Sequence, residues 1–369
     1  MKIMYLMFSY TVGGTERLIA DICNNMLTKQ NEIHLLIINN MVDERMIRTL
    51  NSNVHIELFN RTVGGKQKIR ILFKVAKYIK KHKIEVIHCN SLDAPELLLV
   101  SKIVSRQTKV FYTIHGMNQY CQLNKWRVFY RNIICDKIIA ISESVKRDII
   151  EAGAKANKVQ VIYNAIDFER MQINAEDKHI FDSKNIVIGN VARFQPEIKG
   201  QDILIDAVKQ LIEEYPTVKC LFAGEADDIH QKMYDDLKQT MQQQYPENIY
   251  FVGNIDNVAE FLSKIDIFVL PSRSEGFGIS LVEAMSMKIP CIASRLEGPE
   301  EVLEFGKRGR LFDANDSEAL CSVIKNVIEN YSKENEIAEN NCSYVRRKYS
   351  IENMTETLLS IYANKDKFM

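Results

Sequence analysis

The stretch IDIFVLPSRSEGFGISLVEAM, residues 265–285, carries three local patterns one after another. An apolar run that ends at Pro271 predicts a buried strand, and the Gly-Phe-Gly turn after it interrupts the regular pattern. From about Ile279 the sequence predicts a helix. A strand that passes through a glycine turn into a helix is the repeating unit of parallel α/β sheets, so the expected fold class is α/β.

The same alternation of short apolar runs and longer amphipathic runs continues through all 369 residues. Strands are expected in the first half at KIMYLMF, EIHLLII, VHIEL, IEVIHC, KVFYTIH, KIIAIS and VQVIY, and in the second half at NIVIGNVA, VKCLFAG, NIYFVG, IDIFVLP and PCIAS. The chain is too long for one ordinary core, and the pattern restarts near Asn185. We therefore predict two domains, residues 1–168 and 184–348, with the boundary region between them at 168–184.

The charges are distributed unevenly, although the formal net charge is +0. Residues 1–170 contain 26 Lys and Arg against 15 Asp and Glu, a balance of +11, and the rest of the chain carries the opposite balance of −11. A basic half is typical of proteins that meet nucleic acid, an anionic lipid surface or a phosphorylated substrate. Two soluble domains of different composition would give the same distribution.

Cysteine usage and hydropathy indicate the compartment. None of the eight cysteines forms a C-x-x-C pair, which argues against zinc and against a disulfide framework and favours reduced thiols in the cytosol. The start MKIMYLMFSYTVGG has no small-residue cleavage site and is interpreted as a first strand. No run approaches the roughly 20 apolar residues of a membrane-spanning helix. The prediction is a cytoplasmic protein, and any membrane contact would be peripheral, at the inner face of the cell membrane.

Glycines and cations follow several of the expected strands. Gly13 and Gly14 stand between the first strand and a helix, where backbone amides could meet a phosphate, although a plain strand-to-helix turn explains them equally well. Arg193 and Lys199 follow the strand NIVIGNVA and could hold a diphosphate, whereas solvated surface charges are the simpler alternative. Ligands of open α/β sheets bind beyond the carboxyl ends of the strands, so these positions are candidate sites.

The turn EGFG at 275–278 places backbone N–H groups at the start of a helix, an arrangement that suits an anion. Glu275 would repel phosphates, so it is expected to meet a neutral group that bears hydroxyls. Glu283 could accept the two hydroxyls of a ribose. Together these residues suit a sugar nucleotide, while the alternative for either glutamate is an acidic residue that merely favours a helix N-terminus.

The stretch PSRSEGFGISLVEAM resembles the E-x7-E signature of retaining glycosyltransferases of the family 4 type. Further motifs of that family follow in the same order at GGTER, TIHG, VIYNAID, RFQPEIKG, LFAGEADD and FVGNIDNVAEFLSKIDIFVLPS. The resemblance covers nearly the whole chain and implies the GT-B fold, in which two Rossmann-like domains with parallel sheets face each other across a cleft. It also implies an N-terminal domain that binds the acceptor, a C-terminal domain that binds the nucleotide sugar, and a helix over 349–369 that returns to the first domain.

The resemblance implies roles for individual residues. Gly13 and Gly14 would contact the donor through their backbone, and His115 would lie near the transferred sugar. Arg193 and Lys199 would neutralise the departing diphosphate. The remaining donor contacts would come from Glu275 on the sugar hydroxyls, the backbone of Gly276, Phe277, Gly278 and Ile279, Glu283 on the ribose, and Val252 and Gly253 at the base.

His115 could instead be a structural residue after a strand, and the other six histidines show no metal-ligand spacing. No D-x-D pair occurs in the chain, so a metal-clamped diphosphate is not expected. We predict no metal and no cofactor, with cations and helix dipoles stabilising the leaving diphosphate. Family members often have glycine where Lys288 and Ala226 stand, and these departures leave the identity of the nucleotide open.

Two stretches of the basic half predict amphipathic helices. Within residues 66–83 one apolar face combines Ile69, Leu72, Phe73, Ala76 and Ile79, beside a basic stripe of Arg70, Lys74, Lys77 and Lys81. Within NKWRVFYRNII the apolar residues are Trp126, Phe129, Tyr130 and Ile133, beside Lys125, Arg127 and Arg131. Either helix could pack against a core, or it could rest on an anionic membrane, as the resemblance implies for enzymes with lipid-linked acceptors. No nucleic-acid-binding motif accompanies the charge, so nucleic acid is not expected as a partner.

The predicted function is a metal-independent, retaining transfer of a hexose or N-acetylhexosamine from a nucleotide diphosphate sugar, with UDP chosen and GDP or ADP left open. The acceptor that the resemblance implies is a lipid-linked saccharide or a polysaccharide in bacterial surface polysaccharide synthesis. A nucleotide-sugar epimerase of similar two-domain fold and a non-catalytic nucleotide-sugar binding protein remain as alternatives. A phosphorylase is a third, but the sequence holds no lysine motif for a pyridoxal cofactor.

Overall fold

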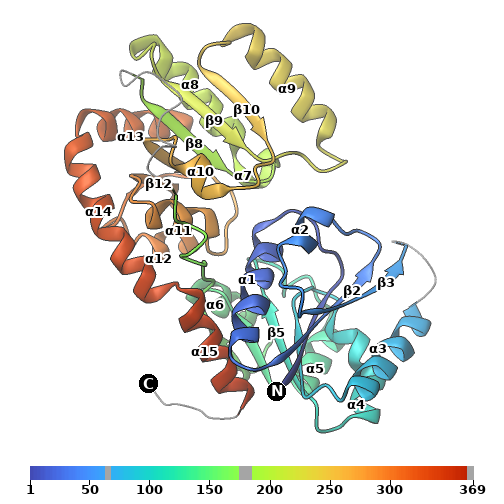
Figure 1. The fold of residues 1–369 in the computed structure, drawn as a ribbon. Coiled ribbons are helices and arrows are strands. Elements are labelled where there is room, and N and C mark those ends of the chain that lie inside the picture. The colour runs from blue at the N-terminus through green and yellow to red at the C-terminus, as the bar shows by residue number, and fades with distance from the viewer. Residues whose placement is uncertain (63–67, 174–184, 364–369) are drawn as a thin grey trace. The chain divides into compact units, whose positions relative to one another are not determined.

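The computed structural model of the protein describes residues 1–62, 68–173 and 185–363, which form two compact units (Figure 1). Unit 1 comprises Met1–Ala165 together with the segment that starts at Ile351, and unit 2 comprises Ile166–Ser350. Most of the predicted boundary region, residues 174–184, lies outside the described residues. The last six residues of the helix predicted over 349–369 and the first two of the stretch 66–83 lie outside them as well.

Unit 1 is built on a parallel sheet of seven strands in the order β3-β2-β1-β4-β5-β6-β7. The strands are β1 (Lys2–Met7), β2 (Glu32–Asn39), β3 (His55–Arg61), β4 (Val86–Cys89), β5 (Lys109–Ile114), β6 (Lys137–Ala140) and β7 (Val159–Val161). The inner strands are buried almost throughout, which explains why their sequences are continuous apolar runs. β3 forms an edge, and its side chains are exposed or half-buried.

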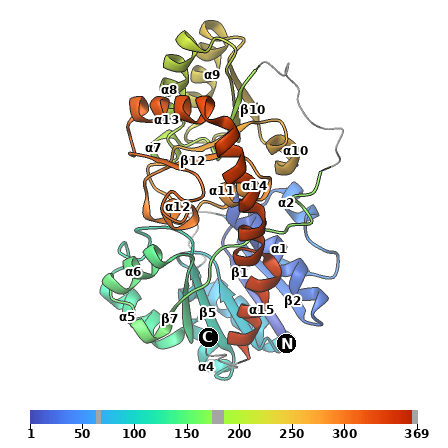
Figure 2. The same cartoon turned by 90° about the vertical axis from the view of Figure 1, so that its left-hand side faces the viewer.

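Helices connect the strands of unit 1 (Figure 1). They are α1 (Gly14–Thr28), α2 (Glu44–Arg48), α3 (Lys68–His82), α4 (Leu99–Val104), α5 (Lys125–Ile134) and α6 (Glu143–Glu151), with 3-10 turns η1 (Pro95–Leu98) and η2 (Ala156–Lys158). Three of them begin at residues whose side chains accept a backbone N–H of the first turn, namely Asp43, Asn124 and Ser142. Helix α15 (Ile351–Tyr362) also belongs to unit 1 and lies beside α1 (Figure 2).

A buried polar network fixes α15 to the sheet of unit 1. The hydroxyl of Tyr362 contacts the Nδ1 atom of His88 on β4 and lies 3.3 Å from the hydroxyl of Tyr5 on β1. The Nε2 atom of His88 lies 2.6 Å from Thr113 Oγ1 on β5. Burial lowers the pKa of His88 to about 3, so the imidazole is neutral and can bridge two hydroxyls.

Helices α3 and α5 expose apolar side chains that the sequence leaves open between core and surface. On α3 the predicted apolar face is only partly covered, because Ala76 and Ile79 are buried whereas Ile69 and Phe73 are 71% and 60% exposed. Ile69 lies in the first turn of the helix, and Phe73 lies about 120° around the helix from Ile79, at the opposite edge of the face. On α5 the buried residues include Arg131, which the sequence places among the basic residues beside the apolar ones. The buried guanidinium of Arg131 contacts both carboxylate oxygens of a glutamate on η1.

Unit 2 has the same plan, with a parallel sheet of six strands in the order β10-β9-β8-β11-β12-β13. The strands are β8 (Val187–Val191), β9 (Lys219–Ala223), β10 (Ile249–Gly253), β11 (Ile267–Leu270), β12 (Cys291–Ser294) and β13 (Arg310–Phe312). The helices are α7 (Pro196–Lys199), α8 (Gln201–Glu214), α9 (Gln231–Gln244), α10 (Val258–Leu262), α11 (Ile279–Ser286), α12 (Glu297–Val302), α13 (Ser317–Glu329) and α14 (Tyr331–Lys348). In both sheets the strand order reverses beside the first strand, between β1 and β4 and between β8 and β11. Ligands of open α/β sheets bind at such switch points.

Lys288, a position at which the resemblance implies glycine, has an unusual backbone. It follows α11 with a φ of 62°, in the left-handed region that favours glycine after the end of a helix. Its side chain forms a 2.6 Å ion pair with Glu339 on α14. This departure from the family pattern therefore concerns the turn after α11. The ion pair offsets part of the free-energy cost of the positive φ at Lys288.

We expect the protein to lose stability in acid because of His88. Unfolded histidine takes up a proton near pH 6.5, whereas burial lowers the pKa of folded His88 to about 3. Between these values only the unfolded state binds the proton. The free energy of unfolding therefore falls by about 1.4 kcal/mol for each pH unit below 6.5, and the contribution is complete above that pH. Urea unfolding at pH 7 and pH 5 measures the fall.

The matched variant is His88→Gln, because glutamine keeps a donor and an acceptor but does not titrate. Its free energy of unfolding should fall by about 2 kcal/mol less between pH 7 and pH 5 than that of the wild type. Equal falls in the two proteins would show that His88 is not the group responsible.

Candidate functional site

Two loops of unit 2 meet at the switch point of its sheet. The first follows β8 and holds Arg193 and Lys199, and the second follows β11 and spans residues 271–278. The backbone N–H of Arg273 in the second loop donates a 2.8 Å hydrogen bond to the carbonyl oxygen of Ile198 in the first. The two loops are therefore held together by their backbones at the carboxyl edge of the sheet.

Further contacts lock this arrangement. Gly200 has a φ of 66°, and a Cβ atom there would lie 2.0 Å from the carbonyl oxygen of Pro271, so only glycine allows the loops to come this close. The two terminal nitrogens of Arg273 each lie 2.7 Å from a carboxylate oxygen of Asp202 on α8. A guanidinium that meets a carboxylate through two parallel bonds fixes orientation as well as distance.

Lys199 and Glu275 are brought together by these loops. The Nζ atom of Lys199 lies 2.8 Å from Glu275 Oε2, and most of each side chain is shielded from solvent. The sequence predicts a neutral partner for Glu275, and the structure instead gives it a cation, which compensates a carboxylate in a turn that suits anions. Arg193 lies at the carboxyl end of β8 with an exposed side chain.

The glycine turn opens α11 without a side-chain cap. Gly278 is the N-cap residue with a φ of 95°, and a Cβ atom there would approach the side chain of Leu270 to 3.1 Å. The first N–H groups of the helix, from Ile279 onward, form the positive end of its dipole. This end of α11 can therefore stabilise an anion that binds to its N–H groups.

The middle of the turn is packed tightly and offers a ligand only its backbone. A Cβ atom on Gly298 would lie 2.6 Å from the carbonyl carbon of Gly276, so glycine at 298 is needed for α12 to approach the turn. The ring of Phe277 is buried against Tyr349, with centroids 5.3 Å apart. Phe277 therefore anchors the turn through its side chain.

Glu283 on α11 is almost fully buried, with 6% of its surface exposed, and it has a partner that the sequence does not reveal. The Nη2 atom of Arg170 lies 3.1 Å from Glu283 Oε1, and the Arg170 side chain is itself mostly buried. A buried carboxylate without a cation is strongly destabilising, so Arg170 makes this position tolerable for a charge. Arg170 stands 113 residues before Glu283, and no local pattern marks it.

Val252 and Gly253 lie at the carboxyl end of β10, two strands away from β8. Val252 is exposed, and Gly253 has a φ of 73° that favours glycine. The side chains of Asn254 and Glu225 meet beside them, with Asn254 Nδ2 donating to Glu225 Oε2 at 2.6 Å. These residues share the carboxyl edge of the sheet with the two loops, but they do not stand at the switch point.

Three of the predicted residues belong to unit 1. Gly13 precedes α1 with an extended backbone that any residue can adopt, and Gly14 is the first residue of the helix. His115 follows β5, and its Nε2 atom lies 3.1 Å from Asn90 Oδ1, to which it can donate. Burial lowers the pKa of His115 to about 4, so the ring is neutral. Its Nδ1 atom is buried and has no hydrogen-bond partner among the described residues, so a ligand hydroxyl could donate to it.

Two surface hollows of the described chain lie at the opposite edges of the sheets. The larger, of about 680 Å³, is lined by residues at the amino ends of β4 and β5. The smaller, of about 520 Å³, is lined by residues at the amino ends of β11 and β12. Neither includes a predicted site residue, and ligands of such sheets bind at the carboxyl edge, so the loops after β8 and β11 are the better candidate.

Two family models match consecutive parts of the chain. The model Glycosyltransferase Family 4 matches residues 12–170, and the model Glycosyl transferases group 1 matches residues 171–343. An uncharacterised glycosyltransferase of Methanocaldococcus jannaschii is 30% identical over 256 residues, which cover 68% of this chain and 67% of that protein. The chain belongs to the glycosyltransferases. This glycosyltransferase is therefore an enzyme that transfers sugars.

Further relatives agree with the assignment. The capsular polysaccharide biosynthesis glycosyltransferase CapM of Staphylococcus aureus is 26% identical over 327 residues, which cover 85% of each chain. Among solved structures, HepE of Anabaena in complex with UDP and glucose matches with a TM-score of 0.86 and 24% identity, over 99% of this chain and 100% of that chain. The likeness confirms the predicted GT-B fold, with one parallel-sheet α/β unit of seven strands and one of six.

Removal of Arg170 should destabilise the glycosyltransferase. Arg170→Met leaves Glu283 buried without its cation, and the loss of one partner of a buried ion pair lowers the free energy of unfolding by about 3 kcal/mol. Glu283→Gln in the same chain removes the stranded charge and should restore part of that loss. Urea unfolding of the wild type, both single variants and the double variant measures the interaction as a double-mutant cycle. If Arg170→Met costs as much in the Glu283→Gln background as in the wild type, the pair is not stabilising.

Proposed function

We propose that this glycosyltransferase moves a hexose or an N-acetylhexosamine from UDP to a lipid-linked saccharide or polysaccharide acceptor in bacterial surface polysaccharide synthesis, with retention of the anomeric configuration. The observation that carries the proposal is the Lys199–Glu275 pair beside the glycine turn that opens α11. A cation, backbone N–H groups and a carboxylate stand together there at the carboxyl edge of unit 2. A sugar diphosphate needs these kinds of partner.

The departing diphosphate would be held by protein charges and dipoles. When the bond from the anomeric carbon to the diphosphate breaks, its electron pair stays on the diphosphate oxygen. Lys199 and Arg193 would supply the compensating cations, and the N-terminus of α11 would supply N–H donors. Because these groups are fixed before the bond breaks, they lower the barrier without reorganisation, and the scheme uses no metal.

Glu275 would change partners when the donor binds. The diphosphate would compete with Glu275 for the ammonium of Lys199. The freed carboxylate of Glu275 would then accept hydrogen bonds from hydroxyls of the sugar and so orient the sugar ring. The acceptor hydroxyl would attack from the face that the diphosphate leaves, and its proton would pass to an oxygen of the diphosphate. The new bond would form on the same face as the old one, which retains the configuration.

The other predicted residues would bind the rest of the donor. Glu283, which Arg170 holds in place, would accept the ribose hydroxyls. The Nδ1 atom of the neutral His115 ring would accept a hydrogen bond from a hydroxyl of the transferred sugar. Backbone contacts would come from Gly13, Gly14, Gly276, Phe277, Gly278 and Ile279, and base contacts from Val252 and Gly253.

The named relatives support this choice of donor and acceptor. HepE was solved in complex with UDP and glucose, and CapM is named for capsular polysaccharide biosynthesis. A nucleotide-sugar epimerase or a non-catalytic binding protein would hold the same donor without an acceptor. Incubation with donor alone identifies an epimerase, which would form a new isomer. A binding protein would bind the donor without turnover, whichever acceptor is added.

Lys199→Ala should reduce sugar transfer far more than it reduces stability. Removal of one preorganised donor to a developing anion typically costs 100-fold or more in turnover, so we expect a loss of about 100-fold. Loss of a partly exposed ion pair changes the free energy of unfolding by only about 1 kcal/mol. Release of UDP from a panel of UDP-sugars with saccharide acceptors measures turnover, and the anomeric signal of the product in proton NMR reports retention.

Arg193→Ala tests the second cation in the same assay, and Lys209→Ala is the matched control. Lys209 lies on α8 and pairs on the surface with Asp206, away from the two loops. Full activity of both Lys199→Ala and Arg193→Ala would contradict the assignment of the diphosphate. A melting temperature that rises with GDP or ADP but not with UDP would correct the nucleotide.

We also propose that unit 1 rests on an anionic membrane surface through an exposed apolar face. This face consists of Ile69 and Phe73 on α3, Leu99, Ile103 and Val104 on α4, and Trp126, Phe129 and Ile133 on α5. Figure 1 shows these three helices at one end of unit 1. None of the helices in the described residues has the length and apolar character needed to cross a membrane.

The charges around this face match an anionic surface. Four lysines of α3 are exposed beside Phe73, at positions 74, 77, 80 and 81, and Lys125 is exposed beside Trp126. Residues 1–170 carry a balance of +11. Each basic residue near an anionic leaflet contributes about 1 kcal/mol to the binding free energy, and burial of the apolar side chains in the membrane would add to it.

Trp126 makes this contact measurable, because it is the single tryptophan of the chain and is 80% exposed. We expect its fluorescence to shift to the blue when vesicles that contain phosphatidylserine are added, and the shift to weaken with salt. Phe129→Ser should weaken binding to these vesicles about tenfold, since it removes one large apolar contact. The control is Ile229→Ser in unit 2, an exposed apolar residue outside the face, which should bind as the wild type does. If the vesicles cause no blue shift, or if the protein binds uncharged vesicles equally well, the anionic membrane is not what binds this face. A protein partner would then be the alternative.

A further inference from the structure

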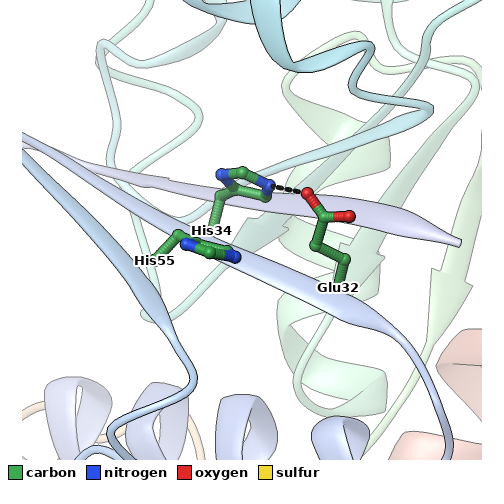
Figure 3. Close-up of side chains that lie close together, drawn as sticks. All are labelled: Glu32, His34 and His55. Carbon is green, nitrogen blue, oxygen red and sulfur yellow. Dashed lines mark hydrogen bonds and ion pairs between the residues drawn. The ribbon is translucent and has the colours of Figure 1, made fainter.

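A cluster of histidine and carboxylate side chains lies on unit 1, on residues that the proposed reaction does not use. Glu32 and His34 on β2 and His55 on β3 each offer one nitrogen or oxygen atom, and these three atoms lie within 4.8 Å of one another (Figure 3). His34 and His55 are direct neighbours in the register of the two parallel strands. Glu32 precedes His34 by two residues, so its side chain projects from the same face of the sheet.

One member of the cluster is buried, and the other two reach the surface. His34 is 1% exposed, and its Nε2 atom lies 3.0 Å from Glu32 Oε1. The rings of His34 and His55 stack with their centroids 4.8 Å apart. The ammonium of Lys2 lies 2.8 Å from Glu32 Oε2 and 3.1 Å from Glu32 Oε1, and Oε1 also faces the imidazole of His34. Figure 3 shows the side chains of Glu32, His34 and His55 turned toward one another.

Helix α3 contributes a hydrogen-bond partner to the buried imidazole of His34. The hydroxyl of Tyr78 lies 2.8 Å from the Nδ1 atom of His34. A hydroxyl can donate to this nitrogen or accept from it, so it can hold either tautomer of the ring. Histidines that bind a metal through one nitrogen almost always donate their other N–H to such a partner.

We propose that Glu32, His34 and His55 bind a zinc ion at the edge of the sheet of unit 1. Two imidazoles and one carboxylate are a ligand set that zinc accepts, with a fourth position left for water. Zinc bonds of about 2.0–2.2 Å place the ligand atoms of a tetrahedral site roughly 3.3 Å apart. His34 Nε2 and Glu32 Oε1, 3.0 Å apart, need to separate only slightly, and a rotation of the exposed His55 side chain would bring in the third ligand.

The ion would join β3 to the rest of the sheet. β3 is an edge strand with exposed or half-buried side chains, so few apolar contacts hold it. A zinc ion between His55 and the two residues of β2 would add a bond between neighbouring strands, and through Tyr78 it would tie both to α3. The mixed nitrogen and oxygen ligands favour zinc over magnesium, which prefers oxygen ligands alone.

Isothermal titration of the full chain with zinc chloride, after treatment with a chelator, tests the site. We expect one zinc ion per chain and a higher melting temperature in its presence. His55→Gln should weaken zinc binding by more than about 100-fold, and because His55 is exposed this variant should fold. Tyr78→Phe removes only the supporting hydroxyl and should weaken binding about tenfold, the loss typical of an outer-sphere partner. Cobalt in place of zinc should give the visible absorption of a tetrahedral ion in the wild type and not in His55→Gln.

The matched control is His230→Gln, because His230 of unit 2 also contacts two carboxylates, those of Asp227 and Glu197. This variant should bind zinc as the wild type does. Unchanged affinity in His55→Gln, loss of binding in His230→Gln, or no zinc uptake by the wild type would each overturn the proposal. If His55→Gln is not obtained folded, Glu32→Gln answers the same question through the other strand. Equal affinity for magnesium would also contradict it.

Discussion

The compensation of two carboxylates in unit 2 is the constraint on which the candidate site depends. Glu275 stands in a turn whose backbone suits an anion, and Glu283 is almost fully buried in the helix that follows. Each carboxylate has a cation from elsewhere in the unit, Lys199 for the first and Arg170 for the second, and for the buried Glu283 that cation is essential to stability. The site is therefore assembled by long-range ion pairs as well as by its own motif.

These two ion pairs differ in what a ligand could do to them. Lys199 and Glu275 are partly open to solvent, so an incoming diphosphate could take the ammonium and release the carboxylate. Arg170 and Glu283 are more deeply buried, and their exchange with a ligand would cost more. The first pair is suited to change partners during a reaction, whereas the second is suited to fix the position of a carboxylate that binds.

Unit 1 combines a well-packed sheet with two kinds of surface that its own core does not need. The apolar side chains on α3, α4 and α5 are exposed on helices whose other faces pack inward. The cluster of Glu32, His34 and His55 lies at the edge strand of the same sheet. The exposed apolar side chains add nothing to the core, so they are explained better by something that binds unit 1 than by its folding.

The sequence by itself determined the fold class and most of the strands, because buried parallel strands are continuous apolar runs and glycine turns separate them from helices. It also marked the loops after β8 and β11, since polar residues that follow buried strands stand out locally. Only the tertiary structure decided which charges meet. Arg170 is paired with a residue 113 positions away, and His34 meets His55 through the register of two strands, with no ligand spacing along the chain. It also decided that Ile69 and Phe73 stay exposed, because the rest of unit 1 covers only part of the apolar face of α3.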